Sequence, residues 1–273
     1  YKMDKNILDK IINKKKEKLI NLKKKHPFES LKEQASDSIN YIDFRQKIES
    51  NISKNKISII AEIKKASPSA GIIIDDYDPS FIANVFIKNK ATCLSILTEE
   101  DFFLGNLDHI YKIKSKTNKM DTNDIHIPIL CKDFFIDPYQ VPLAKHYGAD
   151  AILIILSAVT EKIANQLYEE ALKLKMTVVV EVHTKDEAKS ALKFKEALIG
   201  INNRNLKTLK TEINTTFNIH DILSSHERPL ISESGIKTKE QLLEIAEKTK
   251  IKTFLIGESL LKRLDKNSIF TVL

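Results

Sequence analysis

The chain has little of what marks several protein classes. It contains two cysteines and no tryptophan among 273 residues. Cys93 and Cys131 both lie in apolar, strand-like runs, which indicates buried thiols in a reducing cytosol. Hydrophobic runs stop short of the roughly 18 residues that cross a bilayer, and we expect no signal peptide. The sequence therefore predicts a cytoplasmic protein without membrane association.

Motifs for metals and dinucleotides are also missing. The seven histidines include no HExxH and no paired Cys/His spacing, so no metal site is predicted. His183 lies two residues after Glu181 without a visible group of metal ligands, and we expect it to make a structural hydrogen bond. No glycine-rich turn of the dinucleotide-binding type occurs either.

The formal charge of +7 is confined to one end of the chain. Residues 1–25 hold ten lysines against three acidic residues, which accounts for the whole excess. The same segment carries apolar residues at near-helical spacing: Ile7, Leu8, Ile11, Ile12, Leu19 and Leu22. We predict an amphipathic helix that packs on the main domain and leaves its lysines solvated. Binding to nucleic acid or to a membrane surface is less favoured, because no aromatic residues are interleaved and no nucleic-acid module is recognisable.

From residue 57 onward, strand-like apolar runs alternate with helical patterns. Strands are predicted near residues 57–64, 93–98, 127–132, 151–156, 177–182, 197–202, 229–233 and 253–257. Helices are predicted near residues 41–49, 79–89, 104–116, 138–146, 160–173, 184–194, 213–223 and 237–248, with a last one from residue 258.

Several of these strands are almost wholly apolar. AILIIL (151–156) and TVVVEV (177–182) suit parallel strands that are covered on both faces. Eight strand–helix units in this length predict an α/β fold, a (β/α)8 TIM barrel with extra N-terminal helices, and a doubly wound open sheet is the alternative. We expect one barrel domain over residues 1–273, with residues 1–50 as a helical extension packed on the barrel.

Charged and polar residues stand where the predicted strands end. In ISIIAEIKKASPSAG (57–71), alternation puts Ile60, Glu62 and Lys64 on one face of an extended strand. Other strands end in Lys132 and Asp133, in Glu181 and His183, in Asn202, Asn203 and Arg204, in Ser232, Glu233 and Ser234, and in Gly257 and Glu258. One polar strand end can simply meet water. Several that converge on the carboxyl rim predict a site, because barrels hold their catalytic residues there.

Two of these strand ends are suited to binding a phosphate group. Ser234-Gly235 follows the seventh predicted strand, and Gly257 directly precedes the last predicted helix. Backbone N–H groups at such loops and helix starts bind anions, and this quarter of a barrel is a frequent phosphate site. Turn geometry alone is the alternative explanation for either glycine.

Eight segments resemble the indole-3-glycerol-phosphate synthase family, in the family's order. They are IAEIKKASPSAG (60–71), FFLGNL (102–107), ILCKDFFIDPYQ (129–140), YGADAILIILS (147–157), VVEVHT (179–184), IGINNRNLKT (199–208), ISESGI (231–236) and FLIGESLL (254–261). The resemblance covers nearly everything from residue 40 onward, whereas residues 1–25 lie outside these segments. Ala70 stands where the family often has lysine, so no lysine can bind substrate from that position.

The resemblance implies a reaction and its requirements. The substrate would be 1-(2-carboxyphenylamino)-1-deoxyribulose 5-phosphate, which undergoes ring closure, decarboxylation and dehydration to indole-3-glycerol phosphate in tryptophan biosynthesis. No metal or organic cofactor is implied. The expected partner is this small phosphosugar–anthranilate substrate, without nucleic acid or membrane, and we expect a monomer or weak homo-oligomer.

The resemblance also implies roles for individual residues. Lys132 would protonate the sugar carbonyl oxygen during ring closure, where a cationic acid meets developing negative charge. Lys64 would hold the substrate and act as acid in dehydration. Glu181 would be the base of dehydration, and Glu62 would orient the lysines and the substrate. The implied substrate-binding residues are Ser67 in the mobile loop after the first strand, Phe134, Leu153, Asn202, Arg204, Glu233 and Ser234. The implied phosphate-binding residues are Lys64, Ser234, Gly235, Gly257 and Glu258.

Two other functions fit parts of the pattern. Another phosphosugar barrel enzyme, such as the phosphoribosylanthranilate isomerase that precedes this step, would share the phosphate loops. The combination of Glu62, Lys64, Lys132 and Glu181 suits decarboxylative cyclisation better. A non-catalytic barrel that binds partners through its basic helix is the second alternative, and the intact acids and bases argue against it. For Phe134 and Leu153, ordinary core packing is the alternative to a contact with the aromatic ring.

Overall fold

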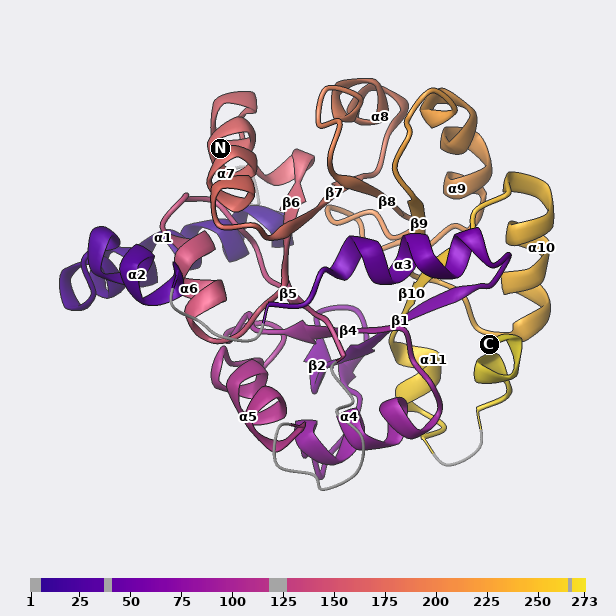
Figure 1. The fold of residues 1–273 in the computed structure, drawn as a ribbon, viewed down its shortest axis with the longest axis horizontal. Coiled ribbons are helices and arrows are strands. Elements are labelled where there is room, and N and C mark those ends of the chain that lie inside the picture. The colour runs from indigo at the N-terminus through magenta and orange to yellow at the C-terminus, as the bar shows by residue number, and fades with distance from the viewer. Residues whose placement is uncertain (1–5, 37–40, 118–126, 265–266) are drawn as a thin grey trace.

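Eight parallel strands close into a barrel in the computed structural model, which describes residues 6–36, 41–117, 127–264 and 267–273 (Figure 1). In chain order they are β1 (Ser58–Ile63), β4 (Cys93–Leu97), β5 (Ile129–Lys132), β6 (Ala151–Ile155), β7 (Thr177–Val182), β8 (Leu198–Asn202), β9 (Leu230–Glu233) and β10 (Thr253–Ile256). Neighbours pair in the order β1-β10-β9-β8-β7-β6-β5-β4, and β4 pairs with β1 to close the ring. The predicted (β/α)8 barrel is confirmed, and the open sheet is excluded.

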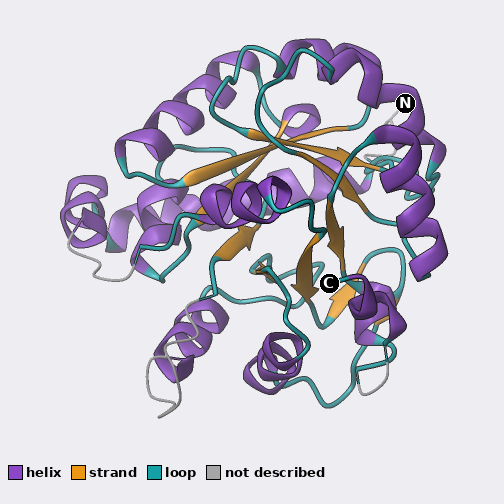
Figure 2. Cartoon of the chain, turned by 45° about the vertical axis from the view of Figure 1, so that its right-hand side comes forward, coloured by secondary structure: helices purple, strands orange, loops and turns teal. Residues whose placement is uncertain are grey.

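Helices surround the barrel and cover the outer faces of its strands (Figure 2). They are α4 (Pro79–Lys88), α5 (Asp108–Thr117), α6 (Gln140–His146), α7 (Glu161–Lys173), α8 (Lys185–Ala191), α9 (Asn214–Ile219), α10 (Lys239–Thr249) and α11 (Glu258–Leu261). Short 3-10 helices occur at η1 (Leu156–Ala158), η2 (His220–Leu223) and η3 (Ser268–Val272). The helix predicted near residues 213–223 is therefore divided into α9 and η2. No helix of the described residues is long and apolar enough to cross a membrane.

Threonine side chains begin three of the barrel helices. Thr160, Thr184 and Thr238 precede α7, α8 and α10, and each hydroxyl accepts a hydrogen bond from the N–H three residues later. Such caps satisfy N–H groups that have no partner inside the helix. Asp78 caps α4 in the same way, with Pro79 in the first turn, where a proline lacks no needed donor. These local signals set where each strand–helix connection ends.

The helix α3 (Phe44–Ser53) closes the amino ends of the barrel strands. Its Phe44 and Ile48 side chains are fully buried, and Asn51 donates to Ser58 Oγ at the start of β1 over 3.0 Å. The helix was predicted near residues 41–49 but begins at Phe44. Asp43 is the reason, because its carboxylate accepts the N–H of Gln46 and so caps the helix there.

The helix α1 (Ile7–Lys25) lies at the opposite, carboxyl side of the barrel. Its buried residues are Leu8, Ile11, Lys15 and Leu19. The expectation that its lysines are solvated is wrong for Lys15, which is buried, whereas Lys18 is partly exposed and Lys23 is exposed. Lys15 pairs with Asp133, Lys18 with Glu100 and Asp101, and Lys23 with Asp137. The basic face of α1 is therefore partly docked on acidic loops of the barrel.

The helix α2 (Phe28–Ser36) was not predicted. The carbonyl of Pro27 accepts the N–H of Leu31 over 3.2 Å, so the proline stands at the start of a helix, where it needs no N–H of its own. The side chains of Leu31 and Leu19 pack with Tyr139 and Leu143. This small cluster attaches α1 and α2 to α6.

A two-stranded hairpin, β2 (Ala66–Ser67) and β3 (Gly71–Ile72), follows β1 and was also not predicted. The Ser-Pro-Ser-Ala-Gly sequence forms its turn, and Gly71 has the positive φ of 66° that glycine adopts at little cost. Ser67 thus lies in a short paired strand and is buried, whereas it was expected in a mobile loop.

Candidate active site

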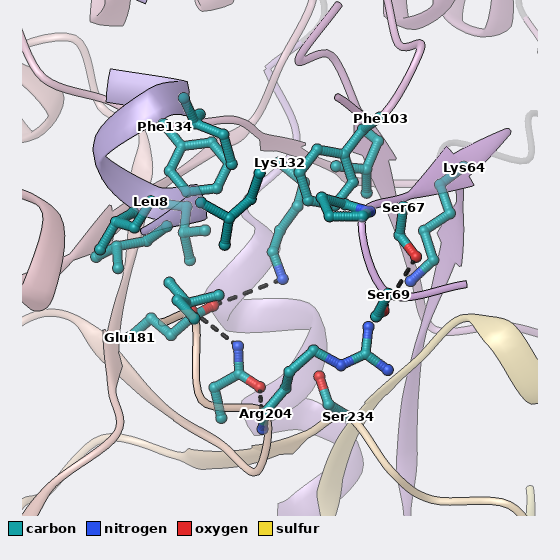
Figure 3. Close-up of a pocket in the computed structure, with 18 of the residues that line it drawn as sticks. Leu8, Lys64, Ser67, Ser69, Phe103, Lys132, Phe134, Glu181, Arg204 and Ser234 are labelled. Atoms are coloured by element: carbon teal, nitrogen blue, oxygen red, sulfur yellow. Dashed lines mark hydrogen bonds and ion pairs between the residues drawn. The ribbon is translucent and has the colours of Figure 1, made fainter. Parts of the chain in front are cut away.

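A cavity lies at the carboxyl ends of the barrel strands (Figure 3). It is lined by the following residues named from the sequence: Glu62, Lys64, Ser67, Lys132, Phe134, Leu153, Glu181, Asn202, Arg204 and Ser234. An adjoining cavity shares Glu62, Lys64, Arg204 and Ser234 and adds Gly235, Gly257 and Glu258. Glu233 lines neither cavity, but its carboxylate lies directly beside Lys132. The structure therefore brings all the expected site residues to one rim.

Lys132 ends β5 and places its ammonium group among three carboxylates. Its Nζ atom lies 3.3 Å from Glu233, 3.5 Å from Glu62 and 3.6 Å from Glu181. Burial alone would lower the pKa of Lys132, but the three carboxylates outweigh burial and raise it. The side chain is therefore a permanently charged cation held near the centre of the site.

Glu62 on β1 and Lys64, which directly follows the strand, form a close ion pair. Lys64 Nζ donates to Glu62 Oε1 over 2.6 Å, and both residues are buried. Burial would raise the pKa of Glu62, but Lys64 and Lys132 hold it below its ordinary value. Gly257 leaves room for this pair, because a Cβ there would lie 2.9 Å from Glu62 Oε1 and 3.3 Å from Lys64 Nζ. The glycine expected at a phosphate site thus also accommodates the ion pair.

Glu181 on β7 is held by an amide and an imidazole. Asn202 Nδ2 donates to Glu181 Oε1 over 2.9 Å, and His183 Nε2 lies 3.2 Å from the same oxygen. The other side of the His183 ring faces Glu187, which also accepts the His183 N–H. Burial would lower the pKa of His183, but Glu181 and Glu187 raise it to about 9. His183 is therefore an imidazolium at neutral pH, more than the structural hydrogen bond expected from sequence.

Glu181 and Glu233 face each other across β8. Gly200 on β8 pairs in register with Glu181, and a Cβ on Gly200 would lie 1.9 Å from Glu233 Oε1. Glu181 Oε2 and Glu233 Oε1 are buried and accept no hydrogen bond from the described residues. Burial and the nearby Glu181 carboxylate raise the pKa of Glu233 to about 8, against the attraction of Lys132. One proton held between the two carboxyl groups at neutral pH satisfies both oxygens.

The turn after β9 lies at the adjoining cavity, which both Ser234 and Gly235 line. The two residues have consecutive positive φ angles of 66° and 80°. Gly235 is also required sterically, because a Cβ would lie 2.6 Å from Thr211 Cγ2. The Glu258 carboxylate faces Lys262 and Arg204. Glu258 can therefore contact a phosphate only through its backbone.

An apolar wall occupies the side of the cavity opposite that turn. Phe134 and Leu153 belong to it, together with Phe103, whose ring centroid lies 6.1 Å from that of Phe134 (Figure 3). Leu8 and Ile11 of α1 complete it. Sequence reasoning missed these α1 residues and Phe103. The apolar stripe of α1 was visible in the sequence, but nothing there showed what it covers.

Two further residues named at strand ends serve the scaffold. Asn203 accepts from Thr216 and donates to the Ser234 carbonyl over 3.0 Å, so it braces the turn after β9. Asp133 also lines the cavity, and its carboxylate pairs with Lys15. Within the described ranges, no group of three or more His, Cys, Asp and Glu side chains is arranged to hold a metal ion.

Comparisons with known proteins agree with this geometry. The family model described as indole-3-glycerol phosphate synthase matches residues 8–272. The match includes most of α1, although none of the eight resembling segments lies there. The indole-3-glycerol phosphate synthase of Carboxydothermus hydrogenoformans is 35% identical over 97% of this chain and 98% of its own length. That of Prochlorococcus marinus is 40% identical over 97% of this chain and 88% of its own.

Solved structures support the fold at much lower sequence identity. The 3-hexulose-6-phosphate synthase of Salmonella typhimurium has a TM-score of 0.59 at 11% identity, over 80% of this chain and 98% of its own. The tryptophan synthase alpha subunit of Legionella pneumophila has a TM-score of 0.54 at 11% identity, over 85% and 94%. These two likenesses concern the fold alone. From the match over residues 8–272 and from the curated relatives, the chain belongs to the indole-3-glycerol phosphate synthase family, whose enzymes are decarboxylating lyases of tryptophan biosynthesis.

Proposed function

We propose that this chain converts 1-(2-carboxyphenylamino)-1-deoxyribulose 5-phosphate to indole-3-glycerol phosphate. The observation that carries the proposal is the position of the Lys132 ammonium, 3.3 to 3.6 Å from three carboxylates at the carboxyl rim. The reaction needs a cation where negative charge develops and a carboxylate that can remove a proton nearby. The apolar wall suits the aromatic ring, and the turn after β9 suits the phosphate.

In ring closure, the ring carbon that bears the carboxylate attacks the sugar carbonyl. Lys132 donates a proton to the carbonyl oxygen as negative charge develops there, and carbon dioxide then leaves. The surrounding carboxylates support this role because they raise the pKa of Lys132 and keep the ammonium charged. Its side chain is only 15% exposed, so its charge acts at a lower local dielectric than in water, where it is more effective.

In dehydration, Glu181 removes a proton and Lys64 protonates the departing hydroxyl. Burial would raise the pKa of Glu181, but Lys132 and His183 lower it, so the carboxylate is ionised and can accept a proton. Glu62 holds the Lys64 ammonium over 2.6 Å and so orients the acid. Two separate lysines thus serve the two chemical stages.

The remaining residues bind the substrate from three sides. Phe134 and Leu153 contact the aromatic ring. The contacts to the sugar and the carboxylate come from Ser67, Asn202, Arg204, Glu233 and Ser234. The phosphate is held by Lys64 and by the backbone of Ser234, Gly235, Gly257 and Glu258.

The same proposal includes the wider setting of the enzyme. The chain acts without a cofactor, in the cytoplasm, as one domain over residues 1–273 with residues 1–50 as an extension, and as a monomer or weak homo-oligomer. Two unpaired, buried cysteines support a reducing compartment. Nucleic acid is not a partner, and the pairing of α1 lysines with barrel carboxylates supports this by reducing the free positive charge.

An activity assay tests the proposal directly. Addition of the carboxyphenylamino sugar phosphate should produce a rise in indole absorbance and fluorescence, against a low background because the chain has no tryptophan. Glu181→Gln should stall dehydration, so that rapid-quench mass analysis detects a cyclised, decarboxylated intermediate. Phosphoribosylanthranilate is the control substrate, because its turnover by the wild-type chain would identify the isomerase instead. A folded wild-type chain that produces no indole would contradict the proposal.

A further inference from the structure

Lys15 is a charged residue in the middle of the buried face of α1. It follows Leu8 and Ile11 and precedes Leu19 on that face, and its exposed fraction is 9%. The neighbouring Lys14 and Lys16 are exposed. A buried ammonium is costly unless it is paired. Its position therefore requires a specific partner on the barrel.

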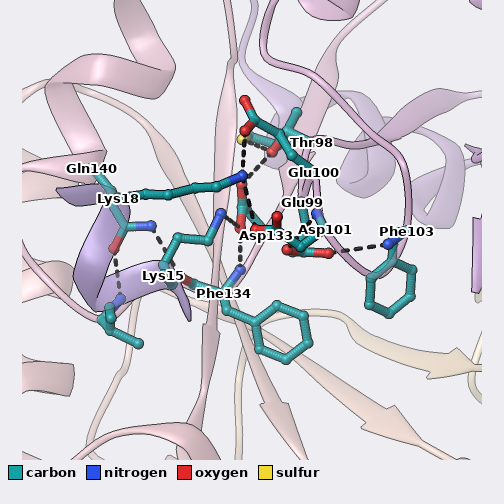
Figure 4. A network of polar contacts seen from close by, with 12 residues as sticks. Lys15, Lys18, Thr98, Glu99, Glu100, Asp101, Phe103, Asp133, Phe134 and Gln140 are labelled. Carbon is teal, nitrogen blue, oxygen red and sulfur yellow. Dashed lines mark hydrogen bonds and ion pairs between the residues drawn. The ribbon is translucent and has the colours of Figure 1, made fainter. Parts of the chain in front are cut away.

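That partner is Asp133, the residue immediately after Lys132 (Figure 4). Lys15 Nζ lies 2.7 Å from Asp133 Oδ1, and Thr98 Oγ1 donates to Asp133 Oδ2 over 2.7 Å. The N–H of Phe134 donates to Asp133 Oδ1 over the same distance. The carboxylate is thus held by three donors, from α1, from the end of β4 and from its own turn.

The network reaches the backbone on both sides of Asp133. The N–H of Thr98 donates to the Lys132 carbonyl over 3.1 Å, while the bond from Phe134 fixes the next residue. The side chains of Lys132 and Phe134 both point into the cavity. On α1, Leu8 and Ile11 line the same cavity from the face that carries Lys15. One buried ion pair therefore joins two walls of the site.

We propose that Lys15 is a positioning residue for the reaction, acting through Asp133 to place Lys132 and Phe134 relative to α1. The proposal rests on the acid role proposed for Lys132. Burial would lower the pKa of Lys15, but Asp133 outweighs burial and raises it, so the pair remains charged at neutral pH. Lys15 itself does not touch the substrate.

Other contacts anchor α1 independently of Lys15. Lys18 pairs with Glu100 and Asp101 over 2.6 and 2.8 Å, and the Tyr139 hydroxyl donates to the Leu22 and His26 carbonyls. Removal of Lys15 should therefore leave α1 attached. Lys18 is the matched control, because it also forms ion pairs with the rim of the barrel, but with Glu100 and Asp101 in place of Asp133.

The first experiment compares Lys15→Met with Lys18→Met in the full chain, well below the unfolding temperature of each variant. Lys15→Met should lower kcat by about tenfold, because small displacements of an acid cost large factors in rate. Lys18→Met should keep kcat within about twofold. Lys15→Arg should retain kcat within about threefold, because the cation is preserved and the cavity beside Lys15 and Asp133 leaves room for the larger group.

A double-mutant cycle separates positioning from simple anchoring. If Lys15 acts through Asp133, then Lys15→Met combined with Asp133→Asn should be about as slow as the slower single variant. The proposal would be overturned if the losses in kcat of the two single variants multiply in the double variant, or if Lys15→Met has a normal kcat. If Lys15→Met does not fold, Thr98→Val replaces it in the same test, because it removes another hydrogen bond to Asp133 and leaves the contacts of α1 unchanged. A wild-type chain that makes no indole product would instead reject the proposed function.

Discussion

At the scale of single residues, the two lysines of the site differ in their surroundings. Lys132 lies among three carboxyl groups from β1, β7 and β9, whereas the ion-pair partner of Lys64 among the described residues is Glu62. The first arrangement concentrates charge around one ammonium. The second leaves Lys64 free to turn towards a substrate phosphate in the adjoining cavity. Removal of either side chain should therefore change the kinetics of the enzyme in a different way.

The first prediction concerns Lys132→Ala and Lys64→Ala. Loss of the ring-closure acid removes an interaction made mainly in the transition state, so Lys132→Ala should lower kcat by about 10²–10⁴-fold with a smaller change in KM. Lys64→Ala should raise KM as well as slow dehydration, because Lys64 also holds the substrate. Steady-state kinetics of both variants checks this. A near-normal kcat in Lys132→Ala would show that another group is the acid.

The second prediction concerns pH and Glu233. Its pKa is raised to about 8 from an ordinary value of 4.5, so the folded protein keeps a proton that the unfolded chain releases. The stabilisation is complete below pH 4.5 and is lost as the pH rises towards 8. Glu233→Gln stays neutral, so its free energy of unfolding should increase relative to wild type across this interval. Urea titrations at several pH values measure the difference.

The same titration should be visible in catalysis. Ionisation of Glu233 above pH 8 places a second negative charge beside Glu181, so wild-type kcat/KM should fall there. In the pH profile of kcat/KM, Glu233→Gln should lack this fall near pH 8 and retain only a fall near pH 9, which comes from His183. An unchanged limb near pH 8 in Glu233→Gln would assign it to a different group.

At the scale of elements, two glycines occupy tight positions of different kinds. A Cβ on Gly200 of β8 would overlap the end of the Glu233 side chain at 1.9 Å. A Cβ on Gly105, in the loop after β4, would meet the Leu97 carbonyl oxygen at 2.3 Å. A carboxyl group can rotate away, but a strand carbonyl cannot. Substitution of Gly200 should therefore affect mainly activity, whereas substitution of Gly105 should affect mainly the stability of the fold.

The third prediction follows from this contrast. Gly200→Ala should displace the Glu233 carboxyl from Glu181 and lower kcat/KM by about 10²-fold, with only about 1–2 kcal/mol lost in unfolding free energy. Gly105→Ala should instead destabilise the fold by about 3 kcal/mol or more, because backbone has to move. Thermal denaturation and kinetics of both variants provide the check. Full activity in Gly200→Ala would show that the Glu181–Glu233 contact is dispensable.

At the scale of the whole molecule, the proposed mechanism takes all its charges from the chain itself. In that mechanism Lys132 is the cation at the developing oxyanion, and no metal-ligand spacing occurs in the sequence. The fourth prediction is that activity survives exhaustive EDTA treatment within about twofold, because no Lewis acid is required. Loss of activity that Zn²⁺ or Mg²⁺ restores would contradict it.

The barrel architecture and the position of the candidate site at the carboxyl rim could be predicted from sequence, because both depend on local patterns. AILIIL (151–156) forms β6 (Ala151–Ile155), since an apolar run of strand length suits a parallel strand that is covered on both faces. Alternation along β1 put Glu62 and Lys64 on one face, and parallel direction brought every strand end to the same rim. The family resemblance then assigned those ends a chemistry.

The sequence by itself determined the eight barrel strands, most of the helices around them and the polar residues that follow the strands, because these follow from periodicity over a few residues. Only the tertiary structure decided which side chains meet. The pattern of α1 showed an apolar face, but barrel closure determined that Leu8 and Ile11 line the cavity and that Lys15 meets Asp133. The contact of Glu181 with Glu233 likewise needs the missing side chain of Gly200 on the strand between them. Such contacts join residues far apart in the chain, so no local pattern records them.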